Sequence, residues 1–319
     1  MSAPHAAPAR VAVLGGTGFI GRVLAGRLVE QGHEVLSLAR TEPAVPVPGR
    51  FARVDLSSTA PAELAALLDR ERIDAVVNAA GGMWGLNDEQ MYEANVVLVD
   101  RLVEAVAAMA TPARLVHLGT VHEYGMAPIG VSQQEDDAPA PVMEYGKLKL
   151  AATESVVRAI AAGQVDGVVL RLGNVVGAGQ PGHSLLGVMA AKLDAARLAG
   201  ETAQLSLAPL TAQRDFVDLT DTVDAVLAAI ATPTANAVIN VGTGSASAAR
   251  LLVELLIEES GVPTEITEVP APEGTGPETD WQQLDVELAA EQLGWAPRRT
   301  LREAVAALWQ AQVGSAAAQ

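Results

Sequence analysis

The sequence has no cysteine among its 319 residues and only ten aromatic side chains, namely 4 Trp, 3 Tyr and 3 Phe. Without cysteine the chain can form no disulfide, no thiol nucleophile and no Cys-ligated zinc or iron–sulfur centre. Its five histidines never pair at the spacing of metal ligands, so we expect no metal site. With so few aromatic side chains, the core must be built mainly from Ala, Val and Leu.

Positive charge is scarce as well, because 21 Lys and Arg residues face 38 Asp and Glu residues and leave a net charge of −17. This balance disfavours binding to nucleic acid or to an anionic membrane. No apolar run reaches the roughly 18 residues of a membrane span, and the first ten residues lack the apolar segment of a secretory signal. We therefore expect a cytoplasmic protein that holds anionic small ligands with backbone N–H groups and a few arginines.

Short apolar runs alternate with stretches of helical periodicity along most of the chain. The runs expected to form strands are Val11–Leu14, Glu34–Leu38, Phe51–Leu56, Ala75–Ala80, Leu115–Leu118, Gly167–Leu172 and Ala237–Val241. The expected helices are a stretch ending near Gln31, then Glu89–Met109, Lys147–Ala162, and Asp285–Gln310 with a break at Gly294–Pro297. Continuous apolar strands alternating with helices predict an α/β fold, a Rossmann-type doubly wound parallel sheet.

The composition and the regularity of the sequence change after Gly173. Residues 174–187 are rich in Gly and Pro, residues 199–213 look irregular, and residues 262–280 carry four prolines and resemble a loop. We predict a smaller substrate domain interleaved with the nucleotide-binding one. The NADP-binding domain would comprise residues 1–173 plus about 215–245, and the substrate-binding domain about 174–214 plus 246–319.

A glycine-rich turn follows the first predicted strand and opens the first helix. Its glycines fit both G-x-G-x-x-G and G-x-x-G-x-x-G. Glycines let the backbone approach a pyrophosphate closely, and a helix N-terminus adds partial positive charge. The sequence therefore predicts a dinucleotide site, and the alternative is an ordinary tight turn. The loop residues predicted to bind the cofactor are Gly15, Gly16, Thr17, Gly18, Phe19, Ile20 and Gly21.

The end of the second predicted strand indicates which cofactor is bound. NAD sites usually carry Asp or Glu there for the ribose hydroxyls, but this chain reads Ser37-Leu-Ala-Arg40. A guanidinium suits a 2′-phosphate, so Arg40 favours NADP(H), with help from Arg22 at the start of the first helix. The alternative is that both are solvent-facing surface arginines.

Tyr145 and Lys149 form a Y-x-x-x-K pattern at the start of a predicted helix. Residues four apart lie on one helix face. An ammonium close to a phenol stabilises the phenolate and lowers the pKa of the tyrosine, which makes it a usable acid or base near neutral pH. The pair is therefore the candidate catalytic centre, with both residues also placed against the cofactor.

Together these motifs resemble those of the extended short-chain dehydrogenase/reductases, the NAD(P)-dependent epimerase/dehydratase family, over nearly the whole chain. The resemblance implies a cofactor contact for Asp55 with its neighbour Leu56, and a cofactor-lining loop at Asn78, Ala79, Ala80 and Gly81. Leu118-Gly-Thr-Val-His-Glu-Tyr-Gly125 is similar to the family's S-S-x-x-x-Y-G segment, which puts Thr120 at the catalytic Ser/Thr position.

The same resemblance extends to the substrate side. Arg171-Leu-Gly-Asn174 and Arg214-Asp-Phe-Val217 are similar to two family segments that imply a substrate diphosphate held by Asn174 and Arg214. Thr120 and His122 complete the predicted substrate contacts. Leu293-Gly-Trp-x-Pro297 resembles the family's C-terminal L-G-W-x-P.

Two departures from the family narrow the expected reaction. The Asp-Glu pair that follows the catalytic Thr in 4,6-dehydratases is replaced by Val121-His122, and the acid after the second strand that is typical of NAD-retaining epimerases is absent. The Gly81–Leu86 loop resembles the NDP-4-keto-6-deoxyhexose 4-ketoreductases of antibiotic deoxysugar pathways. We therefore expect NADPH-dependent reduction of the C4 ketone of a nucleotide-linked, dTDP-type 4-keto-6-deoxyhexose.

Three alternatives stay open at this point: an NAD(P)-dependent nucleotide-sugar epimerase, a reductase of a non-nucleotide ketone or aldehyde, and a non-catalytic NADP-binding protein. The last is disfavoured because the chain keeps Thr120, Tyr145 and Lys149. As in relatives of the family, Glu89–Met109 and Lys147–Ala162 would form the four-helix interface of a homodimer.

Overall fold

A seven-stranded parallel sheet organises the computed structural model, which describes residues 9–270 and 280–316. The strands lie in the order β10-β6-β5-β4-β1-β2-β3, and every neighbouring pair is parallel. Their bounds are β1 (Arg10–Leu14), β2 (Glu34–Ala39), β3 (Arg50–Arg53), β4 (Ala75–Asn78), β5 (Arg114–Thr120), β6 (Asp166–Leu172) and β10 (Val238–Val241). The predicted doubly wound Rossmann-type sheet is confirmed.

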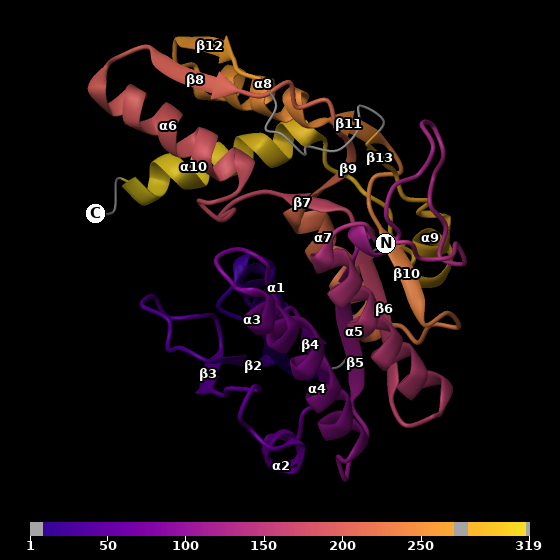
Figure 1. Ribbon diagram of the computed structural model, residues 1–319. Coiled ribbons are helices and arrows are strands. Elements are labelled where there is room, and N and C mark those ends of the chain that lie inside the picture. Colours follow the sequence, from indigo (N-terminus) through magenta and orange to yellow (C-terminus); the bar gives the residue numbers. More distant parts are fainter. Residues whose placement is uncertain (1–8, 271–279, 317–319) are drawn as a thin grey trace, which may run out of the picture.

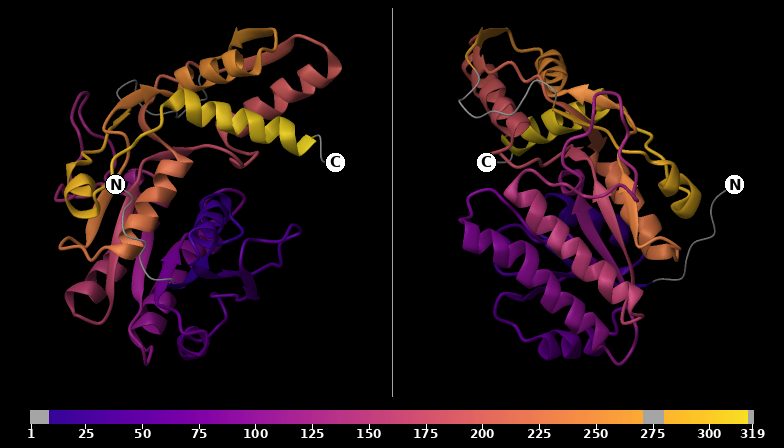
Figure 2. Two further views of the ribbon diagram at one scale, coloured as in Figure 1. Left: turned by 180° about the vertical axis from the view of Figure 1, so that it is seen from behind. Right: turned by 45° about the vertical axis from the view of Figure 1, so that its right-hand side comes forward.

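Apolar cores cover both faces of this sheet, which explains why its strands read as continuous apolar runs. On one face pack α1 (Phe19–Glu30), α7 (Leu219–Ala231) and α9 (Glu287–Leu293). On the other pack α2 (Pro61–Arg70), α4 (Leu98–Ala107) and α5 (Glu144–Ala161). Figure 2 shows α4 and α5 side by side in its right-hand view.

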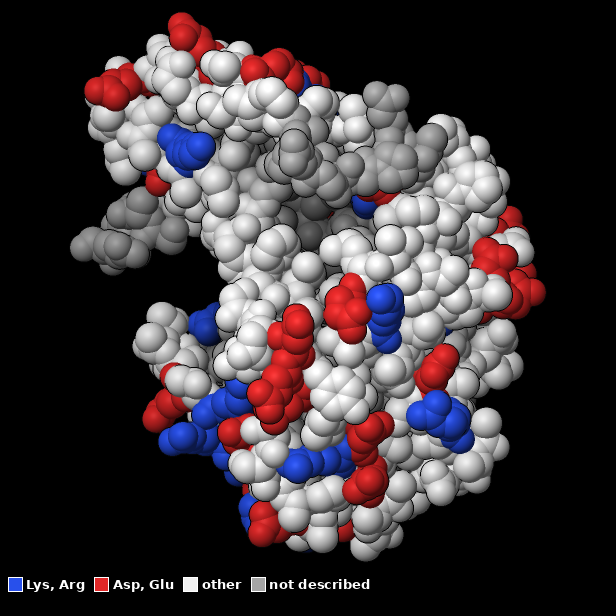
Figure 3. All heavy atoms as spheres, in the orientation of Figure 1, with Lys and Arg blue, Asp and Glu red and all other residues white. Residues whose placement is uncertain are grey.

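A second layer lies across the carboxyl ends of the strands (Figure 1). It contains a small sheet of β7 (Asn174–Val176), β9 (Gln213–Asp218), β11 (Ala246–Ala248) and β13 (Trp281–Gln282). It also contains the parallel pair β8 (Ala203–Leu207) and β12 (Thr264–Glu268), with α6 (Leu185–Ala199), α8 (Ala249–Ser260) and α10 (Leu301–Ala316) around a third core. A hollow separates the two layers in Figure 3. The assignment of these segments to two domains stays a prediction.

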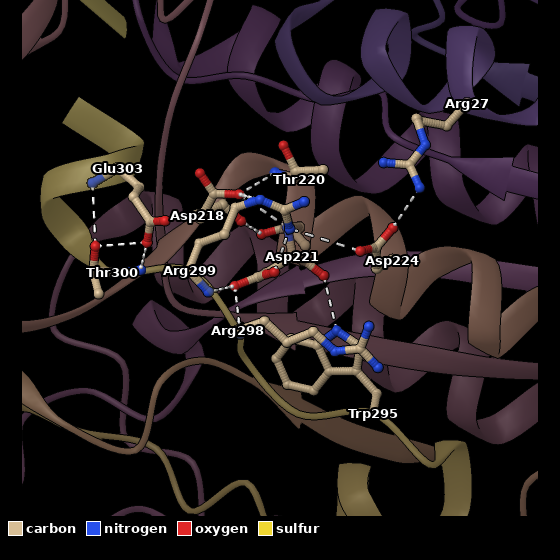
Figure 4. A network of polar contacts seen from close by, with 11 residues as sticks. Arg27, Asp218, Thr220, Asp221, Asp224, Trp295, Arg298, Arg299, Thr300 and Glu303 are labelled. Atoms are coloured by element: carbon tan, nitrogen blue, oxygen red, sulfur yellow. Dashed lines mark hydrogen bonds and ion pairs between the residues drawn. The ribbon is translucent and has the colours of Figure 1, made fainter. Parts of the chain in front are cut away.

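One tie between the layers explains the L-G-W-x-P segment (Figure 4). Trp295 donates its indole N–H to the backbone carbonyl of Asp221 on α7, at 2.9 Å. The Asp221 carboxylate accepts the backbone N–H groups of Arg298 and Arg299, each at 2.8 Å, and the Arg299 guanidinium at 2.6 Å. The chain that leads into α10 is thereby fixed to a helix of the seven-stranded layer.

The predicted helix Glu89–Met109 is interrupted in the structure. It divides into α3 (Asp88–Tyr92), the π-helical segment η1 (Glu93–Val97) and α4. The cause is Asn95, whose Nδ2 donates to the Met91 carbonyl at 2.8 Å and to the Gly82 carbonyl at 2.7 Å. A side chain that competes for helix carbonyls widens the turn.

Three predicted segments differ in extent. The strand predicted to reach Leu56 ends at Arg53, because Asp55 turns the chain by accepting the N–H of Ser57 at 3.0 Å and of Thr59 at 2.7 Å. The strands β8 and β12 lie in segments expected to be irregular, and residues 271–279 of the second segment lie outside the described residues. In β8 buried and exposed side chains alternate, a pattern that the sequence AQLSL already carries.

Within residues 9–270 and 280–316, no helix combines the length and the apolar character needed to cross a membrane. The first eight residues, on which the expectation of no secretory signal rests, lie outside the described part.

Candidate active site

A cavity of about 600 Å³ opens at the carboxyl edge of β1, β2 and β4, where the predicted dinucleotide site should lie. The predicted cofactor residues in its wall are Gly15, Thr17, Gly18, Arg40, Asp55, Leu56, Ala79, Ala80 and Gly81. They come from four loops far apart in sequence. The parallel strand order is what brings these loops together at one edge.

The glycine turn fits a dinucleotide. Gly15 has a φ of +73°, and a Cβ on it would lie 2.7 Å from the Ala79 carbonyl oxygen, so no other residue fits there without a shift. A Cβ on Gly21 would collide with the Gly15 carbonyl oxygen. The helix α1 begins after Gly18, with no side chain capping it and no acidic residue in its first turn. Its free N–H groups and positive dipole end can therefore receive a pyrophosphate.

Some predicted cofactor residues lie outside this wall. They are Gly16, Phe19, Ile20, Gly21, Arg22, Asn78, Tyr145 and Lys149. Arg22 donates to the backbone carbonyls of Val45 at 3.3 Å and Pro46 at 2.7 Å, so its guanidinium fixes a surface loop rather than reaching the cavity. Asn78 supports the cofactor loop by accepting the Ala80 N–H at 3.1 Å.

Two charged residues of the cavity wall, Arg40 and Asp55, lie in the region beyond β2. Arg40 enters the cavity wall, and its backbone carbonyl accepts the Arg53 Nε–H at 3.0 Å. Asp55 accepts the Ser57 hydroxyl at 2.7 Å, and this hydrogen bond is the main cause that lowers the pKa of the Asp55 carboxyl. Arg40 and Arg53 lower it further. This carboxylate is therefore charged and partly engaged before any ligand binds.

The structure brings the predicted catalytic residues together from β5 and α5. Thr120 is the last residue of β5, and its Oγ accepts the His122 N–H at 3.4 Å. Tyr145 and Lys149 occupy the first turns of α5, and Lys149 donates from Nζ to the Leu118 carbonyl at 2.6 Å. The start of α5 thus packs against the end of the strand that carries Thr120, and Lys149 makes a direct hydrogen bond to that strand.

The pKa of Tyr145 differs from expectation. Burial raises it to about 12, and the carboxylate of Glu123 adds to the rise. The predicted lowering by Lys149 is wrong for the protein alone, because the Lys149 ammonium is directed at a carbonyl while the phenol is desolvated. Burial also lowers the pKa of Lys149, to about 8, although Glu123 opposes this change. The pKa values of tyrosine and lysine ordinarily lie within about half a unit of each other, whereas here burial raises the pKa of Tyr145 and lowers that of Lys149.

His122 lies between the catalytic phenol and the predicted diphosphate residue. Its ring meets the Tyr145 ring edge-on, with 6.3 Å between the centroids. Burial lowers the pKa of His122 to about 4, the charge of Arg214 lowers it further, and Asp280 partly opposes them. His122 is therefore a neutral hydrogen-bonding group near pH 7.

The two predicted diphosphate residues lie on neighbouring strands. Asn174 begins β7 and Arg214 lies on β9, which pairs with β7. Arg214 forms an ion pair with the Asp280 carboxylate and donates to the carbonyls of Gln213 at 3.2 Å and Asp280 at 3.1 Å. Asn174 donates to the Asp215 carbonyl at 3.2 Å and also borders a smaller cavity of about 190 Å³.

Two residues of this site were missed by the sequence analysis, Asp280 and Glu123. Asp280 gave no local signal, since its partner Arg214 is 66 residues away in the chain. Glu123 did give a signal, because Thr120-Val-His-Glu123 fits the S/T-x-x-E pattern of a capping box. Both halves of that box are formed.

Comparisons with known proteins show what the chain as a whole is similar to. Residues 11–242 match the NAD dependent epimerase/dehydratase family. A dTDP-6-deoxy-L-talose 4-dehydrogenase (NAD(P)(+)) of Kitasatospora kifunensis is 80% identical over 312 residues, which cover 98% of each chain. A UDP-glucose 4-epimerase of Streptomyces lividans is 28% identical, covering 93% of this chain and 94% of that protein. The structure of MoeE5 in complex with UDP-glucuronic acid and NAD superposes with a TM-score of 0.81 at 29% identity, over 96% and 99% of the two chains.

These findings correct the predicted reaction. The sequence analysis expected reduction of a C4 ketone, whereas the relative that is 80% identical is named for the opposite direction, dehydrogenation at C4. The expectation failed because the catalytic residues serve hydride transfer in either direction, so their identity carries no information on direction. The alternative of an epimerase-type enzyme agrees better with the comparisons than the reductase does.

Proposed function

The chain belongs to the NAD dependent epimerase/dehydratase family, and on this premise we propose that it is an NAD(P)-dependent oxidoreductase that oxidises the C4 hydroxyl of a dTDP-linked 6-deoxyhexose. The proposed substrate is dTDP-6-deoxy-L-talose or a close analogue. The observation that carries the proposal is 80% identity over 98% of both chains to an enzyme of that name. The proposal is also supported by the position of Thr120 at the end of β5, against which the start of α5 with Tyr145 and Lys149 packs.

The reaction removes a proton from the C4 hydroxyl and a hydride from C4. A bound oxidised nicotinamide supplies the hydride acceptor and adds a positive charge to the site. The side chains of the protein take up the proton: Tyr145 in its phenolate form accepts it on Oη and becomes the neutral phenol, and the hydroxyl of Thr120 donates a hydrogen bond to the same sugar oxygen. Lys149 is the cation one helical turn from the phenol, and its ammonium would stabilise the phenolate once it turns away from the Leu118 carbonyl. His122, neutral and adjacent, is placed to bind a sugar hydroxyl.

The substrate diphosphate is proposed to bind at Arg214 and Asn174. Because Asp280 now neutralises the Arg214 guanidinium, the diphosphate must compete with that carboxylate. A bidentate guanidinium–phosphate contact is a strong enough interaction to do so. The small cavity bordered by Asn174 and Phe216 lies on the same side and suits the planar base of the nucleotide.

The direct test is to supply dTDP-6-deoxy-L-talose with NADP⁺ or NAD⁺ and to follow absorbance of the reduced cofactor. Net formation of NAD(P)H together with a 4-keto sugar in the NMR spectrum is expected. Interconversion of C4 epimers without net NAD(P)H would favour the epimerase alternative instead. A cofactor that stays bound through dialysis would point the same way.

The cofactor choice gives a further prediction. Arg40 lines the cavity where β2 ends and no acid stands there, so we propose a preference for NADP(H). Replacing Arg40 with alanine should raise the Kd of NADPH by about tenfold or more, because a charge-assisted hydrogen bond is lost. The Kd of NADH should change less than about threefold by the same reasoning. Fluorescence titration with both cofactors provides the measurement, and equal losses for the two would contradict the role.

The family resemblance also leads us to propose a cytoplasmic homodimer. The helices predicted to form its interface lie on one face of the sheet (Figure 2). Tyr92 on α3 is half-exposed there. An exposed aromatic side chain on one of the predicted interface helices supports a helical interface between two copies.

A further inference from the structure

A carboxylate with no exposure to solvent lies directly beneath the catalytic cluster. Glu123 ends the 3-10 turn η2 (Val121–Glu123), and its side chain is 0% exposed. One carboxylate oxygen accepts the backbone N–H of Thr120 at 2.9 Å. The other accepts Nε–H of Arg171 at 2.8 Å. Burying a carboxylate costs desolvation free energy even when both oxygens accept hydrogen bonds, so the position of Glu123 calls for an explanation.

The strands on either side make room for this carboxylate. A Cβ at position 119 would lie 2.7 Å from the Glu123 carboxylate, so Gly119 leaves the space open. The β5–β6 register places Arg171 opposite Gly119, which sets the guanidinium against Glu123. The guanidinium also lies 4.3 Å from the centroid of the Tyr124 ring, and this contact holds it in place.

The hydrogen bonds of η2 decide what the Thr120 hydroxyl can do. Glu123 holds the Thr120 backbone, while Thr120 Oγ accepts the N–H of His122 at 3.4 Å. An oxygen that already accepts a backbone hydrogen bond retains its own proton as a donor. The capping box therefore leaves the Thr120 O–H free to donate to a substrate oxygen.

The charge of Glu123 also reaches the two catalytic residues of α5. It disfavours the phenolate of Tyr145 and favours the ammonium of Lys149, and it raises the pKa of both groups. The other groups around this cluster are Arg171 on β6, the neutral ring of His122, the phenol of Tyr124, Glu135 near Arg171 and Tyr124, and His117 on β5, whose pKa burial lowers well below its usual value. Burial raises the pKa of the Glu123 carboxyl itself, while the charges of Arg171 and Lys149 oppose that rise. Within the described part of the chain, Glu123 is the charged group that shifts the pKa of Tyr145.

We propose that Glu123 is a positioning residue of the reaction: its buried carboxylate orients Thr120 through the backbone, and its charge sets the proton balance between Tyr145 and Lys149. This inference rests on the proposed oxidation at C4, in which Tyr145 must accept a proton. By raising the pKa of Tyr145, Glu123 makes the phenolate of Tyr145 a stronger base, and it favours the charged form of Lys149. The same rise in the pKa of Tyr145 means that the phenolate forms only at higher pH.

The test compares Glu123→Gln, which keeps the shape and removes the charge, with Glu123→Asp, which keeps the charge and shortens the reach. In Glu123→Gln the alkaline rise of kcat with pH should move toward acid by about one pH unit, with the KM of the nucleotide sugar unchanged within about twofold. In Glu123→Asp the kcat should fall while the midpoint of the rise stays near its original pH. A purely structural role predicts lower rates in both variants and no shift, and that result would overturn the proposal.

Because Glu123→Gln leaves Arg171 without its carboxylate, the double variant Glu123→Gln/Arg171→Met guards against misfolding. It removes both charges and should show a smaller shift in the same direction. A shift toward alkali, or none, would contradict the charge effect.

A second readout separates this inference from the proposed function. The chain has 3 Tyr, so ¹³Cζ-tyrosine NMR gives a spectrum that Tyr145→Phe assigns directly. The Tyr145 signal should titrate at lower pH in Glu123→Gln than in the unaltered protein. If the enzyme fails to oxidise the dTDP sugar but this shift is seen, the proposed function is wrong and the charge effect stands. If the signal titrates at the same pH in both proteins, the inference on Glu123 is wrong.

Discussion

Replacing Tyr145 with phenylalanine is expected to lower kcat for C4 oxidation by about 10²- to 10⁴-fold, the usual contribution of a positioned general base. The phenol oxygen is the proposed proton acceptor, and its ring packs beside His122. His122 cannot replace it well, because an imidazole with a pKa of about 4 is a weak base. Lys149 cannot either, since its Nζ is held by the Leu118 carbonyl.

Cofactor binding should survive this substitution, because phenylalanine preserves the ring and the cavity wall lies elsewhere. The Kd of NADP⁺, measured by titration, should change by less than about threefold, in keeping with the loss of one hydrogen bond at most. Tyr92→Phe is the matched control, since it removes a phenol oxygen from a half-exposed side chain on α3 and should leave kcat unaltered. Unchanged turnover in Tyr145→Phe would remove the central residue of the mechanism.

The parts of the fold that local patterns specify were predictable. The Gly15–Gly21 turn was predictable because an apolar run, closely spaced glycines and a helical stretch follow one another in the sequence. The structure accordingly has a positive φ at Gly15 and a helix that begins after Gly18 without a side-chain cap. The alternation of apolar runs and helices gave the parallel sheet, since strands covered on both faces have no polar side to show. The spacing of Tyr145 and Lys149 predicted that both lie on one helix, and α5 contains both.

Features that depend on distant parts of the chain were not predictable in the same way. The ion pair of Arg214 with Asp280 joins β9 to the start of β13. The pKa of Tyr145 depends on how deeply α5 is buried and on a carboxylate of another element, so spacing alone misled. Likewise the π-helical turn at Asn95 arises from a contact with Gly82, in a loop 13 residues earlier. In each case the sequence shows the side chain but not its partner.

A second large effect is expected on stability rather than on chemistry. Asp221→Ala should lower the free energy of unfolding by about 3 kcal/mol, because it removes a buried carboxylate that serves three donors. Its side chain is 2% exposed, and the substitution strands the N–H groups of Arg298 and Arg299 together with the Arg299 guanidinium. Since Arg299 is 36% exposed, water can recover part of the loss at the guanidinium, which keeps the estimate at the lower end of the range for buried pairs.

The same substitution should also weaken the active site, because this tie (Figure 4) fixes the segment before α10. The helix α10 in turn packs against β9, the strand of Arg214. Urea unfolding would measure the stability, and the KM of the nucleotide sugar would report the effect on the site. Asp224→Ala is the matched control on the same helix: Asp224 pairs with Arg27 at 3.1 Å and more loosely with Arg299 at 3.8 Å, and its side chain is about a third exposed, so we expect a loss below about 1 kcal/mol. If the two variants lost equal stability, the tie through Asp221 would be no stronger than a surface ion pair, and the connection between the two layers would have to come from the apolar contacts around Trp295 instead.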